Sequence, residues 1–290
     1  MSNYKLQITK LIWPLGGVAA ALLIYFIFIP AFAGRLAISH VVQVGPLALR
    51  WYGLILALAI LTSYFIIRKN SWKFGISQEA VDDFSFWLTI VGIIGARFYY
   101  VIFNLDYFSK NWNEVYQIWQ GGLSIYGAVL AGLGFVYFYT RKRVYNFWQI
   151  ADLLALGLPL GQAIGRFGNF INQEAFGVPT SLPWKMYVAP LYRPIQFAQE
   201  KFFHPAFLYE ALANVLIFIL LYKLVGKHKP GTIALAYLAS YSLFRFFIEA
   251  VRLDSFIIQG FRVDQVIAFM IFITAASLLL HRYGKIAPKA

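Results

Sequence analysis

Residues 147–177, FWQIADLLALGLPLGQAIGRFGNFINQEAFG, begin as an apolar segment and end as a polar one. The apolar part at 148–168 has the length of a membrane-spanning helix, which needs about 20 largely apolar residues. Near its end it carries Arg166, and Asn169, Asn172 and Glu174 follow closely. A charged side chain within the membrane costs at least about 2.5–3.5 kcal/mol. The segment therefore predicts a membrane helix that ends in a functional site.

Apolar segments of similar length recur along the whole chain of 290 residues, which is 60% hydrophobic and 13% charged. They lie near 11–33, 47–67, 84–104, 121–140, 148–168, 206–225, 231–251 and 263–281. No stretch between them is long enough for a soluble domain of about 100 residues. The sequence therefore predicts an all-α polytopic membrane protein with about eight transmembrane helices, organised as a single membrane domain over 1–290.

The basic residues are distributed unevenly between the loops. Fourteen Lys and Arg lie on alternate loops and tails, against eight on the intervening ones. The positive-inside rule therefore predicts that both termini are cytoplasmic. The net charge of +13 arises from these short loops and includes no block of five like charges, so we expect no nucleic-acid partner.

Two segments allow more detailed predictions. Residues 11–33 follow Lys5 and Lys10 and end in Ala-Phe-Ala, which resembles a signal-peptidase site. The apolar part is longer than the usual 7–15 residues of a signal peptide's apolar region, so a retained N-terminal helix is preferred.

Residues 172–204 contain four prolines among aromatic residues. Because Trp184, Tyr187 and other aromatics could form a small core, we expect a folded head outside the membrane.

Cysteine is absent from the chain. This excludes disulfides, cysteine-ligated zinc and a cysteine nucleophile, so any thiol chemistry must use the thiol of a substrate. The chain also lacks the Gly-x-Ser-x-Gly motif of serine hydrolases. Hydrolysis by a serine or cysteine triad is therefore not expected.

Three arginines, Arg97, Arg166 and Arg245, fall within predicted spans. Tyr241, Arg245, Glu249 and Arg252 follow one another at spacings of four, four and three, which predicts that they share one helix face. Such a polar face must meet protein or water. An ion pair between Arg245 and Glu249 that only locks neighbouring helices is the structural alternative.

The polar end of the opening segment favours anion binding. A guanidinium offers a planar fork of donors that matches phosphate oxygens, and an asparagine can donate to the same group. Small-residue helix packing would explain the glycines at 161, 165 and 168, but not Arg166, Asn169, Asn172 and Glu174 together. We therefore expect an anionic phospholipid head group as the ligand. Tyr52, Tyr126 and Glu210 lie near span ends, where a tyrosine is equally typical of an interfacial belt.

With these residues assembled, the chain resembles the prolipoprotein diacylglyceryl transferase family. Residues 165–177 match each fixed position of a signature that reads Gly-Arg-x-Gly-Asn-Phe-x-Asn-x-Glu-x-x-Gly. The other matching residues are Arg50 to Gly53, Gly95 to Arg97, Gly121-Gly122, His204-Pro205, Leu208 to Glu210, Tyr241, Arg245, Glu249, Arg252 and Asp254. The resemblance covers about 40–281 and implies a seven-helix core, to which 11–33 is an N-terminal addition.

The resemblance implies transfer of the sn-1,2-diacylglyceryl group from phosphatidylglycerol to the thiol of a lipobox cysteine in a prolipoprotein. The reaction would release glycerol phosphate at the outer face of the bacterial inner or cytoplasmic membrane, without a metal or cofactor. Arg166, Arg245, Tyr126 and Glu249 are then the expected catalytic residues. The expected substrate-binding residues are Tyr52, Arg97, Asn169, Asn172, Glu174, Gly177, Glu210, Tyr241 and Arg252.

The sequence departs from the family pattern at three places. Many members have histidine where Tyr126 stands, and a tyrosine with a pKa near 10 is a poor base, so the proton acceptor remains open. Phe207 replaces a glutamine, and Asp264 replaces a glycine before Gln265. Two alternatives therefore stay open: a divergent phospholipid-dependent transferase on the same scaffold, and a lipid or anion transporter that uses the same arginines. No inverted repeat that would favour a transporter is visible.

Overall fold

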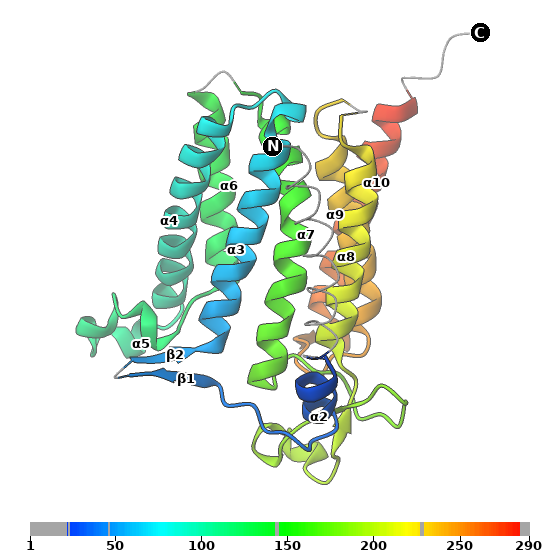
Figure 1. Ribbon diagram of the computed structural model, residues 1–290. Helices are drawn as coiled ribbons and strands as arrows, with labels where there is room; N and C mark the ends of the chain where they lie inside the picture. The colour runs from blue at the N-terminus through cyan, green and yellow to red at the C-terminus, as the bar shows by residue number, and fades with distance from the viewer. Residues whose placement is uncertain (1–21, 23, 46, 143–144, 227–228, 285–290) are drawn as a thin grey trace, which may run out of the picture. The chain divides into compact units, whose positions relative to one another are not determined.

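The computed structural model describes residues 22, 24–45, 47–142, 145–226 and 229–284, and it is mostly helical (Figure 1). The long helices are α3 (Trp51–Asn70), α4 (Gln78–Ile102), α6 (Ile125–Arg141), α7 (Phe147–Asn172), α8 (Ala206–Leu224), α9 (Thr232–Glu249) and α10 (Val263–Gly284). Shorter turns of helix include α2 (Ile29–Phe32), α5 (Leu105–Phe108) and the 3-10 turns η5 (Pro190–Tyr192) and η6 (Ile195–Phe197).

Three antiparallel hairpins complete the described secondary structure. They pair β1 (Val41–Val44) with β2 (Leu47–Arg50), β3 (Met186–Tyr187) with β4 (Phe202–Phe203), and β5 (Ile257–Ile258) with β6 (Phe261–Arg262). The predicted start of the second span at 47 is therefore wrong, because residues 47–50 form a strand. The predicted span at 121–140 likewise begins late, since α6 starts at Ile125.

Within the described residues, five helical segments are long and apolar enough to cross a membrane. They are Trp51–Phe74, Gln78–Ile102, Phe147–Asn172, Ala206–Leu224 and Val263–Arg282. The chain is thus a multi-pass, mostly helical membrane protein. Helices α6 and α9 occupy two further predicted spans but are not among these five. Most of the predicted span at 11–33 lies outside the described residues.

The described chain divides into two compact units. Unit 1 comprises Met1–Leu58, Ala163–Ala213 and Leu243–Phe269, and unit 2 comprises Ala59–Gln162, Asn214–Ser242 and Met270–Ala290. In unit 2, α4 and α6 approach closely where Gly95 faces Gly127, because a side chain at either glycine would meet the backbone of the other helix. Small residues permit such contacts in membrane helices.

Unit 2 has an apolar core of its own and one buried polar contact. Val81, Phe84, Ile150 and Leu153 are each 1% exposed and pack together from α4 and α7. Asp152 on α7 accepts hydrogen bonds from the backbone N–H groups of Gly231 at 2.6 Å and Ala234 at 2.7 Å. These N–H groups have no partner within a helix that begins at Thr232, so the carboxylate caps α9.

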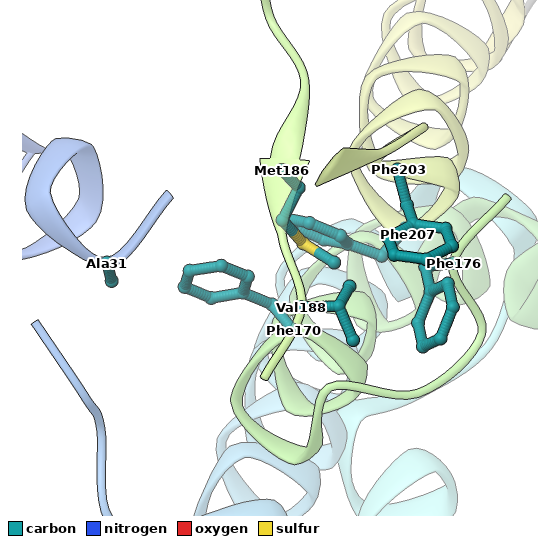
Figure 2. Packing of buried hydrophobic residues seen from close by; sticks show 7 residues of the cluster. All are labelled: Ala31, Phe170, Phe176, Met186, Val188, Phe203 and Phe207. Carbon is teal, nitrogen blue, oxygen red and sulfur yellow. The ribbon is translucent and has the colours of Figure 1, made fainter. Parts of the chain in front are cut away.

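The core of unit 1 joins the segment 172–204 to the ends of α7 and α8. Figure 2 shows Ala31, Phe170, Phe176, Met186, Val188, Phe203 and Phe207 packed as one cluster. The rings of Phe170 and Phe207 stack with centroids 5.0 Å apart. The segment 172–204 thus has buried residues, but they are not all those expected. Met186, Val188 and Phe203 are buried, whereas Trp184 is 51% exposed.

Candidate active site

The carboxylate of Glu210, on α8, lies among three arginines. Its Oε2 is 2.5 Å from Nη2 of Arg166 on α7, and its Oε1 is 3.0 Å from Nη1 of Arg245 on α9 and 2.6 Å from Nη1 of Arg252. Glu210 is only 3% exposed. A buried carboxylate is tolerated when it is paired and hydrogen-bonded in this way. The structure therefore brings together the arginines that the sequence distributes over two helices.

A second buried carboxylate fixes Arg245. Glu249 is one helical turn later on α9, is fully buried, and places its Oε2 2.6 Å from Nη2 of Arg245. Asp264, at the start of α10, is 3.4 Å from the same nitrogen. Arg245 is consequently held by Glu210, Glu249 and Asp264, and its side chain is still 16% exposed. Its orientation is fixed while one side remains accessible.

Arg252 is buried, and each of its three guanidinium nitrogens donates a hydrogen bond. Its Nε and Nη2 donate to the two carboxylate oxygens of Asp254 at 2.9 and 2.5 Å, and its Nη1 donates to Glu210. Burial lowers the pKa of Arg252, but the hydrogen bonds to Asp254 and the charge of Glu210 raise it more, so the group stays charged. Likewise burial raises the pKa of Asp254, but Arg252 outweighs this and brings it below its usual range.

The expectation that Arg252 shares a helix face with Arg245 is wrong, because α9 ends at Glu249. Arg252 lies in the turn that follows, where its backbone pairs with Gly177 in an isolated β-bridge. Arg262 locks this turn: its Nη1 donates to the carbonyl oxygens of Glu249 at 2.7 Å and Arg252 at 2.6 Å. The same nitrogen donates to Oγ of Ser255, which in turn donates to Glu249 Oε1 at 2.5 Å.

A chain of side chains fixes Arg166 from its own helix. Its Nη1 donates to Oδ1 of Asn169 at 3.2 Å, and Nδ2 of Asn169 donates to Glu174 at 2.9 Å. Asn172 donates to the same Glu174 oxygen at 3.3 Å. Since an amide that accepts with oxygen must donate with nitrogen, this order orients Asn169 fully. Arg166 keeps a 22% exposed side chain.

Two glycines of the signature are required by close contacts. A Cβ atom at Gly168 would lie 2.7 Å from the ring of Tyr52, and one at Gly177 would lie 2.7 Å from the carbonyl oxygen of Val251. The turn between them is sharp, because Gln173 and Ala175 both adopt the left-handed backbone conformation. For non-glycine residues this costs of order 1–3 kcal/mol each and is typical of functional sites.

His204 and Tyr209 form a second polar pair in unit 1. Trp184 Nε1 donates to the Tyr209 hydroxyl at 2.8 Å, and that hydroxyl lies 3.0 Å from Nδ1 of His204. An indole N–H can only donate, so the tyrosine hydrogen is free to point at His204. Burial lowers the pKa of His204, which favours the neutral imidazole that accepts this hydrogen bond.

Comparison with known proteins identifies the family to which this chain belongs. The sequence model of the prolipoprotein diacylglyceryl transferase family matches residues 39–281. The chain belongs to this family. A protein of Fervidobacterium nodosum named phosphatidylglycerol–prolipoprotein diacylglyceryl transferase is 42% identical over 272 residues, covering 92% of this chain and 93% of the relative. Proteins of the same name from Thermotoga maritima and Thermosynechococcus vestitus are 41% and 42% identical over 266 and 231 residues, covering 88% and 79% of this chain and 90% and 86% of theirs.

Three residues expected at the family's site, Arg97, Tyr126 and Tyr241, belong to unit 2. Arg97 is buried and donates to the backbone carbonyl oxygens of Glu114 at 2.6 Å, Val115 at 2.8 Å, Gly121 at 2.8 Å and Gly122 at 2.9 Å. Tyr126 is 60% exposed and Tyr241 stacks on Tyr237. Through these hydrogen bonds Arg97 fixes the loop 114–122 that precedes α6.

Sequence reasoning underestimated Glu210 and missed Arg262 and Ser255. Glu210 was expected only to shape the site, yet it contacts Arg166, Arg245 and Arg252. Its position near the start of an apolar helix was the available signal, because a carboxylate there needs a cationic partner. Arg262 was counted only as a loop charge, and no pattern at this position reveals that it points inward.

The cluster is electrically balanced and still able to bind an anion. Four carboxylates, Glu210, Glu249, Asp254 and Asp264, accompany Arg166, Arg245, Arg252 and Arg262. Among the described residues, neither Nε of Arg166 nor Nε of Arg245 has a hydrogen-bond partner. These two partly exposed groups can therefore donate to an incoming oxyanion without giving up their carboxylates.

Proposed function

We propose that this chain transfers the sn-1,2-diacylglyceryl group of phosphatidylglycerol to the lipobox cysteine thiol of prolipoproteins. Membership of the family and the names of its relatives support this function. The observation that carries it is the pairing of Arg166 and Arg245 on one buried carboxylate, with a free donor left on each. The ligand that such a pair fits is a phosphate.

The reaction explains why the donors must be present before the substrate arrives. The thiol loses its proton, the thiolate forms a carbon–sulfur bond with the glycerol methylene, and the carbon–oxygen bond to phosphate breaks. The phosphodiester becomes a glycerol phosphate monoester, so one further negative charge develops on the leaving oxygen. Arg166 and Arg245 stabilise that charge, and because Glu210 and Glu249 already hold them in place, little reorganisation is needed.

The remaining expected residues act around this pair. Asn169, Asn172 and Glu174 orient Arg166 and present amide groups to the head group, while Tyr52 and Gly177 shape the entrance. Arg252 fixes Glu210. We retain Tyr126 as a catalytic residue, with the proton acceptor unassigned, and Tyr241 as a substrate-binding residue, as proposals from the family resemblance. For Arg97 we propose instead the structural role that its four backbone contacts support. No metal or cofactor takes part.

We further propose eight membrane spans with both termini in the cytoplasm of a bacterium and the enzyme in its inner or cytoplasmic membrane. The head at 172–204 and the active site then face outward, and the helix at 11–33 is retained as part of a single membrane domain. The buried Ala31 and the tilted contact between the rings of Phe28 and Phe170, with centroids 4.9 Å apart, support retention. Cysteines at Lys142 and Lys185 should label from opposite sides. Equal labelling by an impermeant reagent would refute this topology.

The decisive experiment incubates purified protein with phosphatidylglycerol and a lipobox peptide. We expect a thioether-linked diacylglyceryl peptide and one glycerol phosphate per peptide, measured by mass spectrometry. A peptide with serine in place of cysteine is the matched control and should gain no mass. Flux of phosphatidylglycerol across vesicles without peptide modification would instead favour the transporter, and transfer from another phospholipid would favour the divergent transferase.

A further inference from the structure

The hairpin of β5 and β6, which follows the arginine cluster, has an apolar surface that the described residues leave exposed. Its four large side chains, Phe256, Ile257, Ile258 and Phe261, are between 52% and 69% exposed. Ile258 and Phe261 flank a two-residue turn in which Gln259 and Gly260 both have positive φ, 47° and 83°. Such a turn gives a tight, well-defined tip. We call residues 256–261 the finger.

The finger contains no charged residue, and the neighbouring Arg262 turns away from it. Arg262 is the only charged residue between Ser255 and Val263. Its guanidinium donates to the carbonyl oxygens of Glu249 and Arg252 and to Ser255, all on the side of the arginine cluster. The outward surface therefore offers aromatic and aliphatic carbon without a charge to keep it in water.

The finger is continuous with a surface that lipid covers. It leads directly into α10, one of the five candidate membrane spans, and the N–H of Val263 donates to the carbonyl of Phe256 at 2.9 Å. On α10, Val266, Ile267 and Phe269 are 47–51% exposed, as expected for residues that face acyl chains. The four exposed apolar side chains of the finger lie just before the start of this helix and extend the same lipid-facing surface.

We propose that the finger is a membrane-inserted anchor whose partner is the lipid of the leaflet on the active-site side. Its base touches the catalytic cluster, since Ser255 donates to Glu249, the carboxylate that holds Arg245. Insertion thus fixes the turn that carries Arg252 and Arg262 at the level of the phospholipid head groups. This inference rests on the proposed function for its role, but not for its test.

The absence of natural cysteine makes the test direct. Single cysteines at Ile258 and Phe261 are labelled with an environment-sensitive fluorophore and reconstituted in phosphatidylcholine–phosphatidylglycerol vesicles. Lys201, an exposed charged residue on the 172–204 segment, provides the matched control position. We expect lipids with a shallow doxyl group to quench the two finger labels at least threefold more than the control label. Aqueous iodide should show the opposite order.

The outcomes separate the possible partners and the two proposals. Iodide quenching of the finger as strong as that of Lys201→Cys would overturn the inference. Loss of doxyl quenching when a lipobox peptide is added would also overturn it, because the occupant would then be the peptide. Lipid quenching in a chain that fails to transfer diacylglyceryl would refute the proposed function and leave the anchor intact. Two further substitutions test the anchor through activity. Phe261→Asp should raise the KM for vesicle phosphatidylglycerol about tenfold, whereas Phe261→Leu, which keeps an apolar side chain, should leave this KM unchanged.

Discussion

Arginines on apolar helices of this chain are stabilised in two different ways. In unit 2, Arg97 donates to four backbone carbonyl oxygens and packs against the rings of Tyr100 and Phe108. In unit 1, Arg166 and Arg245 bind carboxylates and keep part of their surface exposed. The first arrangement uses the donors of the guanidinium to hold a loop. The second orients the guanidinium and leaves donors for a ligand.

This difference distinguishes residues that the sequence could not separate. Arg97, Arg166 and Arg245 were all predicted to be functional because each lies in an apolar span. Their partners in the structure differ, and on that basis we propose that Arg166 and Arg245, and not Arg97, meet a phosphate. Substitutions at these arginines and at the carboxylate between them separate the two arrangements.

Glu210→Gln should have the largest effect on stability. The substitution keeps the shape of the side chain but leaves Arg166, Arg245 and Arg252 without their shared charge. Breaking a buried ion pair costs roughly 3–5 kcal/mol. Unfolding in detergent measures this loss. Glu174→Gln is the control, because the exposed Glu174 accepts from two neutral amides and should lose less than about 1 kcal/mol. Equal losses would contradict a central role for Glu210.

Arg166→Lys and Arg245→Lys should each fold and insert but lose most transfer activity. Lysine keeps the charge but not the planar fork, so the loss is about tenfold to a thousandfold, equivalent to about 1.4–4 kcal/mol of transition-state stabilisation. Turnover of phosphatidylglycerol with a lipobox peptide measures it. Well-folded variants with full activity would show that the site is elsewhere.

Arg97→Lys should show the reverse pattern. A lysine cannot reach four carbonyl oxygens, and each buried group left without a partner costs about 1–3 kcal/mol. We therefore expect thermal stability to fall by about that amount, while kcat/KM per folded molecule stays within about threefold of wild type. If stability is unchanged and transfer is lost, Arg97 contacts the substrate, as the sequence predicted.

Tyr126→Phe should have the smallest effect of the series. A phenol is in general a poor base, so removing this hydroxyl should lower kcat by less than about tenfold. Tyr126→His should keep or raise activity at neutral pH. A fully active phenylalanine variant would exclude proton transfer through this position, and a loss beyond a hundredfold would make the hydroxyl essential.

Much of the fold followed from the lengths of the apolar segments, because a chain that crosses a membrane must satisfy its backbone hydrogen bonds internally and therefore forms helices of about 20 residues. The helices at 206–224 and 263–284 lie close to the predicted bounds. Local backbone geometry was less accessible. The strand at 47–50 looked like the start of a helix because its residues are as apolar as the helix that follows.

The candidate site was predictable in its residue types but not in its connections. Arg166 and Arg245 could be predicted as functional because a charged side chain within a membrane is costly and is usually kept for a function. Their shared contact with Glu210 depends on how three helices pack. The ion pair between Arg252 and Glu210 depends on the end of α9 at Glu249. These are tertiary properties without a local signal in the sequence.

The most direct test of the central claim is whether Arg166 and Arg245 recognise the phosphate itself. Binding of phosphatidylglycerol and of diacylglycerol, which lacks the phosphate, would be compared for wild type, Arg166→Lys, Arg245→Lys and Arg97→Lys. We expect wild type and Arg97→Lys to prefer phosphatidylglycerol by the same factor, and each of the other two variants to reduce this preference about tenfold, or about 1.4 kcal/mol. An unchanged preference in Arg166→Lys and Arg245→Lys would contradict the account.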